Sequence, residues 1–281
     1  MSAASQTGSR NVSAGPTPTR QARPRRTGKE TWAAVRPFVL GSLSLVLLIA
    51  LWQVAVNGHW VKPLFLPGPS KVVHALGSLF SQGEIWSNLR VSGEEFALGL
   101  GISVVLGAVL GLLTGWYKAV DEFLKPLVVG INSMPQVAVV PVLILIFGIG
   151  MTPKIVVVVL SCTTVILMNT AAGVANVDWQ LRRLARSFGA SDPQVIRTIV
   201  LPSLVPFFMT GLRISIGRAM IGVVVGEIFA SKAGIGNVLI SASNSFNMPV
   251  MYATVAIITF LGIALTQVAA LLERRMQRWR R

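Results

Sequence analysis

Residues 178–202 read DWQLRRLARSFGASDPQVIRTIVLP and separate two long apolar runs of the chain. Four residues of this stretch, called the basic loop below, are arginines: Arg182, Arg183, Arg186 and Arg197. Because charged side chains are costly in hydrocarbon, we expect the basic loop to lie outside the membrane, exposed to solvent. Apolar residues recur in it at helical spacing, at Leu181, Leu184, Ala185 and Phe188. Gly189 follows as a helix stop, so the pattern predicts a short amphipathic helix.

A second short helix is predicted directly after the first one. Ser191 and Pro193 suit a cap and a first helical turn, and the helix is expected over residues 194–200, closed by Leu201 and Pro202. A helix that docks a soluble partner and is held between two membrane spans is one way to pass force into a membrane domain.

The basic loop resembles the cytoplasmic coupling loop of the permeases of binding-protein-dependent ATP-binding-cassette importers. The pattern of that family is Glu-Ala-Ala, three residues, Gly, nine residues, Ile, one residue, Leu-Pro. Five positions fall in register: Ala185, Gly189, Ile199, Leu201 and Pro202. Two positions depart from it, because Arg183 stands in place of Glu and Leu184 in place of Ala. The first departure puts a salt bridge from this position to the ATPase in doubt. An ordinary basic cytoplasmic loop would not explain the Gly and Leu-Pro spacing.

The resemblance implies which residues couple this chain to an ATPase. They are Leu181, Arg183, Leu184, Ala185, Phe188, Gly189, Ala190, Ser191, Ile199, Leu201 and Pro202.

Composition indicates the same class of protein independently. Hydrophobic residues make up 53% of the chain and charged residues 12%, whereas charged residues reach about 25% in soluble domains. Six apolar stretches approach or exceed the roughly 20 residues that cross a bilayer. They are residues 37–56, 96–117, 126–150, 155–177, 205–229 and 250–272. We therefore expect an all-α integral membrane protein with about six transmembrane helices, and the resemblance implies a type I importer permease fold.

The distribution of Lys and Arg predicts the orientation of these spans. Eighteen of the 25 basic residues flank the side that holds both termini and the basic loop. Five flank the other, outer side: Lys62, Lys71, Arg90, Lys154 and Lys232. Basic residues mark the cytoplasmic side, so we expect both termini in the cytoplasm of a prokaryote, with the chain in its plasma membrane. The net charge of +15 therefore requires no nucleic acid.

Three regions follow from composition. Residues 1–36 are rich in Ser, Thr, Pro and Arg, which is typical of a disordered basic cytoplasmic tail, or alternatively of a transit peptide. Residues 37–273 form the predicted membrane domain, and residues 274–281 a second basic cytoplasmic tail. The single cysteine, Cys162, excludes a disulfide framework within one chain.

Glycines in the spans predict close helix packing. Gly107, Gly111 and Gly115 repeat every four residues, as do Gly222 and Gly226. Small residues at this spacing let helix backbones approach each other in lipid. The pattern does not say whether the partner helix belongs to the same chain.

Polar residues in the spans are candidates for a translocation path. Pro135 and Pro141 are expected to break the third span, and irregular backbone at membrane depth is tolerated only against protein or a wet cavity. The candidates are Asn132, Ser133, Gln136, Thr163, Thr164, Asn169 and Arg218. Arg218 either pairs or lines an aqueous path that favours an anion, and helix–helix hydrogen bonding is the alternative for the uncharged residues. Glu227 is expected at an outer gate, as a helix contact or as a salt bridge.

The predicted function is ATP-driven import by alternating access. The sequence contains no phosphate-binding loop and no catalytic triad motif, so we predict no catalytic residue, cofactor or metal site, and an energy source in a separate subunit. The resemblance implies cytoplasmic ATPase subunits, an extracytoplasmic binding protein and a second permease chain, for which we expect a homodimer.

The turn at residues 64–70 resembles the nitrate, taurine and aliphatic sulfonate branch, which implies a small anionic solute. A secondary transporter or channel and a non-transporting scaffold are the alternatives.

Overall fold

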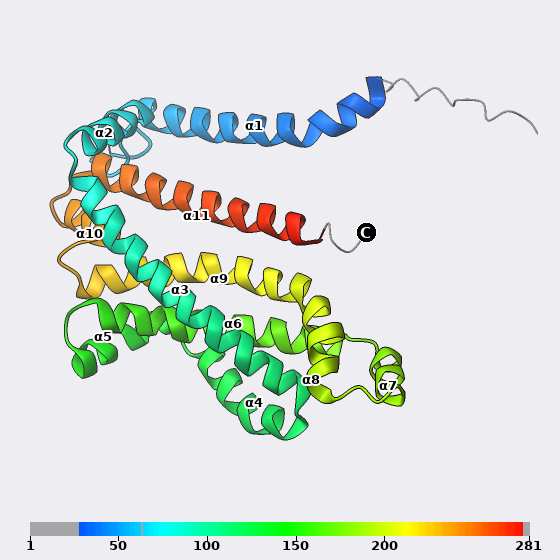
Figure 1. The fold of residues 1–281 in the computed structure, drawn as a ribbon. Coiled ribbons are helices and arrows are strands. Elements are labelled where there is room, and N and C mark those ends of the chain that lie inside the picture. The colour runs from blue at the N-terminus through cyan, green and yellow to red at the C-terminus, as the bar shows by residue number, and fades with distance from the viewer. Residues whose placement is uncertain (1–27, 63, 278–281) are drawn as a thin grey trace, which may run out of the picture. The chain divides into compact units, whose positions relative to one another are not determined.

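The computed structural model describes residues 28–62 and 64–277, and within these ranges every regular element is helical (Figure 1). In chain order the elements are α1 (Gly28–Asn57), α2 (Pro69–Ser81), α3 (Glu84–Trp116), α4 (Lys118–Ser133), α5 (Gln136–Phe147), α6 (Met151–Ala175), α7 (Trp179–Ser187), α8 (Asp192–Val195), the π-helical turn η1 (Ile196–Val200), α9 (Leu201–Ala230), α10 (Ile235–Asn244) and α11 (Met248–Gln277). The chain divides into two units, residues 1–51 and 52–281.

The first unit consists, in its described part, of most of α1. This helix begins at Gly28, inside the predicted N-terminal tail, and the rest of that tail, residues 1–27, lies outside the described residues. The segment Val39–Asn57 is long and apolar enough to cross a membrane, as predicted for residues 37–56. At the other end of the chain α11 runs to Gln277, so part of the predicted C-terminal tail is helical.

The core of the second unit is a close parallel contact between α3 and α6. Four glycines of α3 lie so near α6 that a Cβ atom on any of them would come within 2.5–2.7 Å of a side-chain Cβ or Cγ atom. Each partner stands 59 positions later in the chain: Gly99 meets Val158, Gly107 meets Ile166, Gly111 meets Thr170 and Gly115 meets Val174. Because the register is constant and rises along both helices, they run in the same direction. The predicted close packing is confirmed, and the partner helix lies in the same chain.

The parallel arrangement requires a membrane crossing between α3 and α6. Since α3 and α6 run in the same direction, the chain between Trp116 and Met151 must return across the membrane once. The helices α4 and α5 fill this interval and are bent by 99° relative to each other, while five other segments are each long and apolar enough to span. The described residues thus hold five candidate spans, and six when the bent pair is counted as one broken span, which takes the place of the predicted third helix.

Only one of the two prolines expected to break the third span does so. Met134 is extended and Pro135 stands at the N-cap of α5, because a residue before proline is disfavoured in the helical region. Pro141 lies inside α5, and the helix continues through it. The expectation of a break at Pro141 was wrong, since the loss of one backbone hydrogen bond did not end the helix.

Helix α9 packs antiparallel against α6 and also contacts α3. Gly226 approaches Lys154, Gly222 approaches Val158, and Gly211 approaches Asn169. The glycines of the fifth predicted span therefore also contact a helix of the same chain. Helix α6 thus packs against both α3 and α9, and half of its most apolar segment is buried, more than in any other candidate span of the described chain.

A buried ion pair forms the first contact of the α3–α6 register. Lys154 pairs with Glu95, 59 positions earlier, and their side chains are 4% and 1% exposed. The Lys154 Nζ atom also donates to the Ser231 hydroxyl at 3.1 Å. Lys154 was predicted to lie on the outer flank, and Glu95 was not among the predicted site residues. The structure places both inside the helix packing, where each charge is compensated by the other.

The register predicts that a side chain at Gly107 disrupts the α3–α6 contact. In the Gly107→Val variant the new Cβ lies 2.7 Å from Ile166 Cβ, and overpacking of this kind costs about 1–3 kcal/mol. We expect a lower melting temperature of the purified chain in detergent. Gly101→Val is the matched control, since nothing lies within 4 Å of that position on the same helix. Equal losses in the two variants would contradict the register.

The ion pair predicts an asymmetric mutational response. Lys154→Met leaves Glu95 buried without its partner, which costs about 3–5 kcal/mol of unfolding free energy. The double variant Glu95→Gln/Lys154→Met removes both charges, and we expect it to be more stable than the single variant. Denaturant titration in micelles measures both. A double variant less stable than Lys154→Met would show that the pair does not act as proposed.

Candidate functional site

The basic loop begins with a capped amphipathic helix. The Asp178 carboxylate accepts a hydrogen bond from the backbone N–H of Gln180 at 2.8 Å, which satisfies one of the free donors at the start of α7. Helix α7 then runs from Trp179 to Ser187, where the sequence predicted a short helix.

Gly189 ends α7 in the left-handed conformation, with φ +78°. The Gly189 N–H donates to the Arg186 carbonyl at 2.9 Å, and the Ala190 N–H donates to the Ala185 carbonyl at 3.1 Å. These two bonds form a Schellman motif, in which glycine is favoured because a Cβ atom strains the left-handed conformation. Gly189 was correctly predicted as the stop.

The predicted end of the second helix is wrong. The backbone N–H and the hydroxyl of Ser191 both donate to Gln194 Oε1, and α8 begins there. The chain then passes through η1 into α9 without a break. Pro202 lies in the first turn of α9, and the Leu201 N–H reaches back to the Ile196 carbonyl. Because the π turn widens the helix just before a residue that has no N–H, the helix continues through Leu201 and Pro202.

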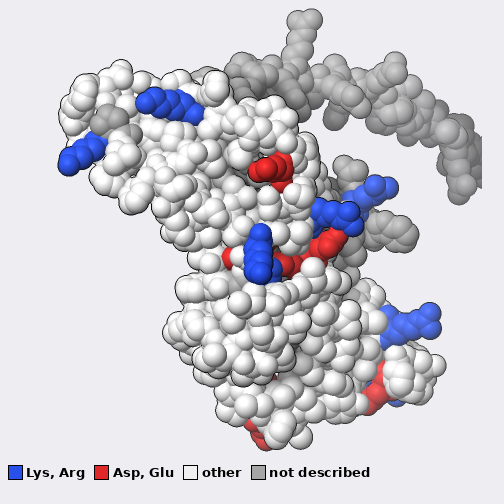
Figure 2. All heavy atoms as spheres, turned by 90° about the vertical axis from the view of Figure 1, so that its left-hand side faces the viewer, with Lys and Arg blue, Asp and Glu red and all other residues white. Residues whose placement is uncertain are grey.

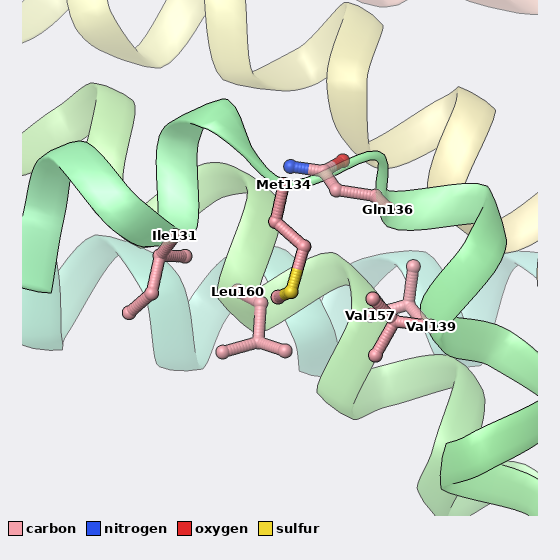
Figure 3. Close-up of a pocket in the computed structure, with 6 residues that line it drawn as sticks. All are labelled: Ile131, Met134, Gln136, Val139, Val157 and Leu160. Carbon is pink, nitrogen blue, oxygen red and sulfur yellow. The ribbon is translucent and has the colours of Figure 1, made fainter.

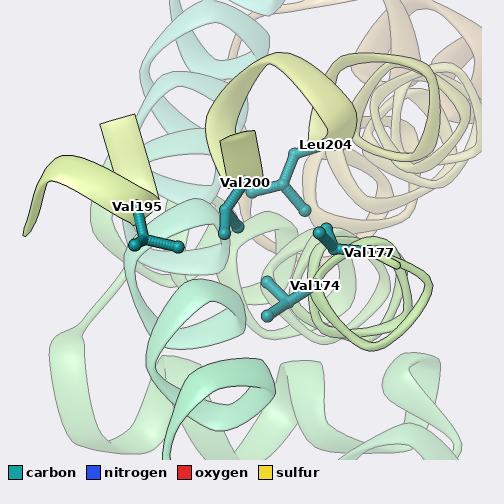
Figure 4. Close-up of a cluster of buried hydrophobic side chains, with 5 residues drawn as sticks. All are labelled: Val174, Val177, Val195, Val200 and Leu204. Atoms are coloured by element: carbon teal, nitrogen blue, oxygen red, sulfur yellow. The ribbon is translucent and has the colours of Figure 1, made fainter. Parts of the chain in front are cut away.

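A small apolar core fixes the loop to the membrane helices (Figure 4). Val195 and Val200 are fully buried and pack with residues at the end of α6 and the start of α9, which are Val174, Val177 and Leu204. Of the predicted coupling residues, Ala185, Ala190 and Ile199 pack against this core. These three therefore hold the loop in place, and the loop and the membrane helices form one packed block.

Other predicted coupling residues are exposed. Leu181, Leu184 and Phe188 are 51%, 55% and 83% exposed. They stand at i, i+3 and i+7 of the α7 region and so share one side of the helix. We call these three residues the apolar stripe. Ser191, Leu201 and Pro202 are also exposed. An apolar row on an ordered helix at the surface is a candidate docking surface.

The arginines of α7 lie on its other side. The Arg183 guanidinium stacks 5.9 Å from the ring centre of Trp179, and Arg186 pairs with Asp192 at 2.9 Å. Arg182 donates to the Val174 carbonyl and lies 5.3 Å from the ring centre of Trp116. Burial, and to a lesser degree repulsion from Arg186, lowers the pKa of Arg182 from its ordinary value. Arg183, the departure from the family pattern, thus contacts its own helix.

The break between α4 and α5 carries part of the predicted polar path. Arg218 Nη1 donates to Asn132 Oδ1 at 3.1 Å, which joins α9 to the end of α4. Asn132 and Ser133 are exposed, and within the described residues no carboxylate forms an ion pair with Arg218. A cation at an irregular point of a membrane span is therefore held by an uncharged partner.

The remaining candidates for the path mostly contact protein. Gln136 Oε1 accepts a hydrogen bond from the Ser161 hydroxyl, which ties the break to α6. A cavity beside it, drawn in Figure 3, has a volume of about 10 Å³, at the lower limit for one water molecule. Thr164 and Asn169 hydrogen-bond to carbonyls of their own helix, and the buried Thr163 hydroxyl has no partner among the described residues. The structure brings Asn132 and Arg218 into contact. Thr163, Thr164 and Asn169 do not hydrogen-bond to either of them.

At the other end of α9, Glu227 is fully buried and joins three elements. Its carboxylate accepts from the Ser92 hydroxyl at 2.5 Å and from the Gly236 N–H at 2.7 Å. The Gly234 N–H donates to Asn88 Oδ1 at 2.7 Å. Of the two alternatives for Glu227, this geometry is that of a helix contact, and it fixes the turn before α10 to α3.

Two features of this end were missed by the sequence analysis. Ser92 and Glu95 continue the row of buried residues that leads to Gly99 on α3, and this spacing is the signal that would have revealed them.

The face that carries α2, α5 and α10 shows scattered charged side chains and no dense patch of either sign (Figure 2).

Comparisons with known proteins agree with this architecture. Over residues 103–278 the chain matches the family described as "Binding-protein-dependent transport system inner membrane component". The putative aliphatic sulfonates transport permease protein SsuC of Bacillus subtilis is 31% identical over 240 residues, which cover 85% of this chain and 87% of the relative. The taurine transport system permease protein TauC of Escherichia coli is 30% identical over 256 residues, with 89% and 93% covered.

Solved structures share the fold at lower identity. A bacterial ABC transporter involved in the import of the acidic polysaccharide alginate matches with a TM-score of 0.62 and 14% identity, covering 87% of this chain and 98% of the other. An amino acid ABC transporter with histidines matches with a TM-score of 0.58 and 18% identity, covering 71% and 97%. The family match spans more than half of the chain, and the first relative exceeds 30% identity over most of both sequences. The chain therefore belongs to the family of binding-protein-dependent transport system inner membrane components.

Proposed function

We propose that this chain is the permease subunit of an importer, moves a small anion by alternating access, and receives its driving force from a separate ATPase through the apolar stripe. The observation that carries the proposal is the exposure of Leu181, Leu184 and Phe188 on a helix that is capped at both ends and packed onto α6 and α9. A partner that binds the stripe pushes on an ordered element, so its motion reaches the membrane helices.

The proposal of an anionic solute is supported by Arg218. Its charge lies in a membrane span, within hydrogen-bonding distance of Asn132 at the break between α4 and α5, and an anion that passes this point gains from it. Relatives named for aliphatic sulfonate and taurine transport favour solutes that carry a sulfonate group. Nitrate is a further trial solute.

The partners proposed are two ATPase subunits, an extracytoplasmic binding protein and a second copy of this chain. Coupling requires that the ATPase bind the inward-open and outward-open permease with different free energies. The apolar stripe is the surface on which this difference acts.

One observation favours a second candidate, a scaffold that docks an ATPase without being driven by it. Arg183 replaces the Glu of the family pattern and stacks on Trp179, so this position offers an ATPase a cation in place of a carboxylate. Proteoliposomes that contain this chain, the candidate ATPase and the binding protein separate the two. Hydrolysis stimulated by binding protein and a sulfonate together supports the importer, whereas ATPase binding without stimulation supports the scaffold.

Phe188 is predicted to dominate docking to the ATPase. Phe188→Ser removes the most exposed apolar side chain of the stripe, and the loss of such an anchor costs about 2 kcal/mol of binding free energy. We expect the affinity for the ATPase to fall about 30-fold. Phe123→Ser is the matched control, a phenylalanine of α4 that is 73% exposed and lies outside the stripe. Equal affinities of the two variants would remove the stripe from the docking surface.

Gly189 is predicted to be required for coupling through its backbone conformation. Gly189→Val places a branched side chain at φ +78°, which costs about 1–2 kcal/mol and weakens the Schellman motif. We expect normal membrane insertion and a loss of solute-stimulated hydrolysis. Gly130→Val is the control, because both positions have nothing within 4 Å and only Gly189 has a positive φ. Gly189→Asn should recover part of the activity, since Asn tolerates this conformation. Full coupling in Gly189→Val would contradict the proposed role.

A further inference from the structure

A cavity of about 280 Å³ lies beside α7, away from the apolar stripe. It is lined by two tryptophans and three arginines, which are Trp116, Trp179, Arg182, Arg183 and Arg186. We call it the arginine pocket. Apart from Trp116, its residues stand at i, i+3, i+4 and i+7 of α7, so they share one side of the helix. The three residues of the stripe fall on the opposite side. A ligand in the pocket therefore leaves the stripe free for a protein partner.

The pocket lies where two membrane helices end. Trp116 is the last residue of α3, and Arg182 donates a hydrogen bond to the carbonyl of Val174, in the last turn of α6. Both helices are long and apolar enough to span the membrane, and both end on the side of the basic loop. Tryptophan side chains favour the depth of the lipid headgroups, so we expect the pocket to lie at the level of the headgroup phosphates.

The charges of the pocket are not balanced within the described chain. Arg186 pairs with Asp192, but neither Arg182 nor Arg183 has a carboxylate within 4 Å. Asp178, the other nearby acid, accepts the hydrogen bond that caps α7. The Nε atom of Arg182 is buried and has no hydrogen-bond partner among the described residues. Guanidinium groups bind phosphate oxygens through several N–H donors at once, so a phosphate ligand would balance the charges of Arg182 and Arg183.

We propose that the arginine pocket binds the phosphate group of an anionic phospholipid of the cytoplasmic leaflet. The arginines supply donors and charge, and the two tryptophans supply an apolar wall for the glycerol and upper acyl region. Basic pockets at the cytoplasmic ends of membrane helices suit such headgroups. A bound lipid holds α7 at the depth of the headgroups while the apolar stripe faces the cytoplasm. Arg183 thus acquires a function that the Glu of the family pattern could not perform.

Lipid binding to the purified full-length chain tests the proposal without reference to transport. Native mass spectrometry in detergent measures the retention of phosphatidylglycerol and of phosphatidylcholine at increasing lipid concentration. We expect selective retention of phosphatidylglycerol, and about fivefold weaker retention in Arg183→Gln, because each arginine near the surface contributes on the order of 1 kcal/mol. Arg183→Lys keeps the charge but loses the paired donors of the guanidinium group, so its retention should fall between those of the parent chain and Arg183→Gln.

Arg197→Gln is the matched control. It removes the same formal charge from the basic loop, and Arg197 is exposed and does not line the pocket. Equal weakening by Arg183→Gln and Arg197→Gln would overturn the proposal in favour of attraction by net charge alone. Displacement of phosphatidylglycerol by millimolar inorganic phosphate would overturn the assignment to a lipid and identify a site for a free anion. Equal melting temperatures of the two variants verify that a loss of binding is not a loss of fold.

Discussion

The close parallel contact between α3 and α6 is the constraint on which the rest of the structure depends. Four glycines in a constant register of 59 residues allow the two backbones to approach without side chains between them. In lipid, where apolar side chains gain little by leaving the solvent, such packing is a main source of association. Because the two helices point the same way, the intervening chain must return through the membrane, and it does so as the broken pair α4 and α5. The return crossing between the two helices therefore follows from this contact, while Pro135 sets where that crossing is broken.

Much of this arrangement could be predicted from the sequence. The predictions that were wrong, for the second loop helix and for Lys154, have physical causes. Apolar length located the spans, and the left-handed preference of glycine located the end of α7 at Gly189. The end of the second loop helix was missed because Pro202 was treated as a stop, whereas proline is tolerated in a first turn and η1 adapts the backbone before it. Lys154 was assigned to a flank because a lysine near a span end usually reaches water. The spacing of Ser92, Glu95 and Gly99 indicates that Glu95 is buried, but it does not identify a partner 59 residues away.

The coupling residues implied by the family pattern separate into two groups with different physical roles. Ala185, Ala190 and Ile199 face the apolar core that joins the basic loop to α6 and α9, and Gly189 makes the turn that brings Ala190 there. Leu181, Leu184 and Phe188 face outward. A motif recognised by spacing alone does not distinguish the residues that pack into the core from those that are exposed at the surface. Arg183 belongs to neither group, because it stacks on Trp179 and lines a pocket on the far side of the same helix.

The proposed transport cycle depends on which helices of the chain move as a rigid body and where the chain can bend. Helices α3, α6 and α9 are locked by glycine contacts along their length, and at one end by the buried Glu95–Lys154 pair and the hydrogen bonds of Glu227. At the other end, the basic loop is packed onto the same helices. A force on the apolar stripe therefore moves this block as a unit, because bending it would open close-packed contacts. The 99° break between α4 and α5 has no continuous backbone ladder to resist rotation. Asn132, at this break, contacts Arg218 of the block. A movement of the block relative to the break therefore changes the surroundings of Arg218, the residue proposed to contact the solute.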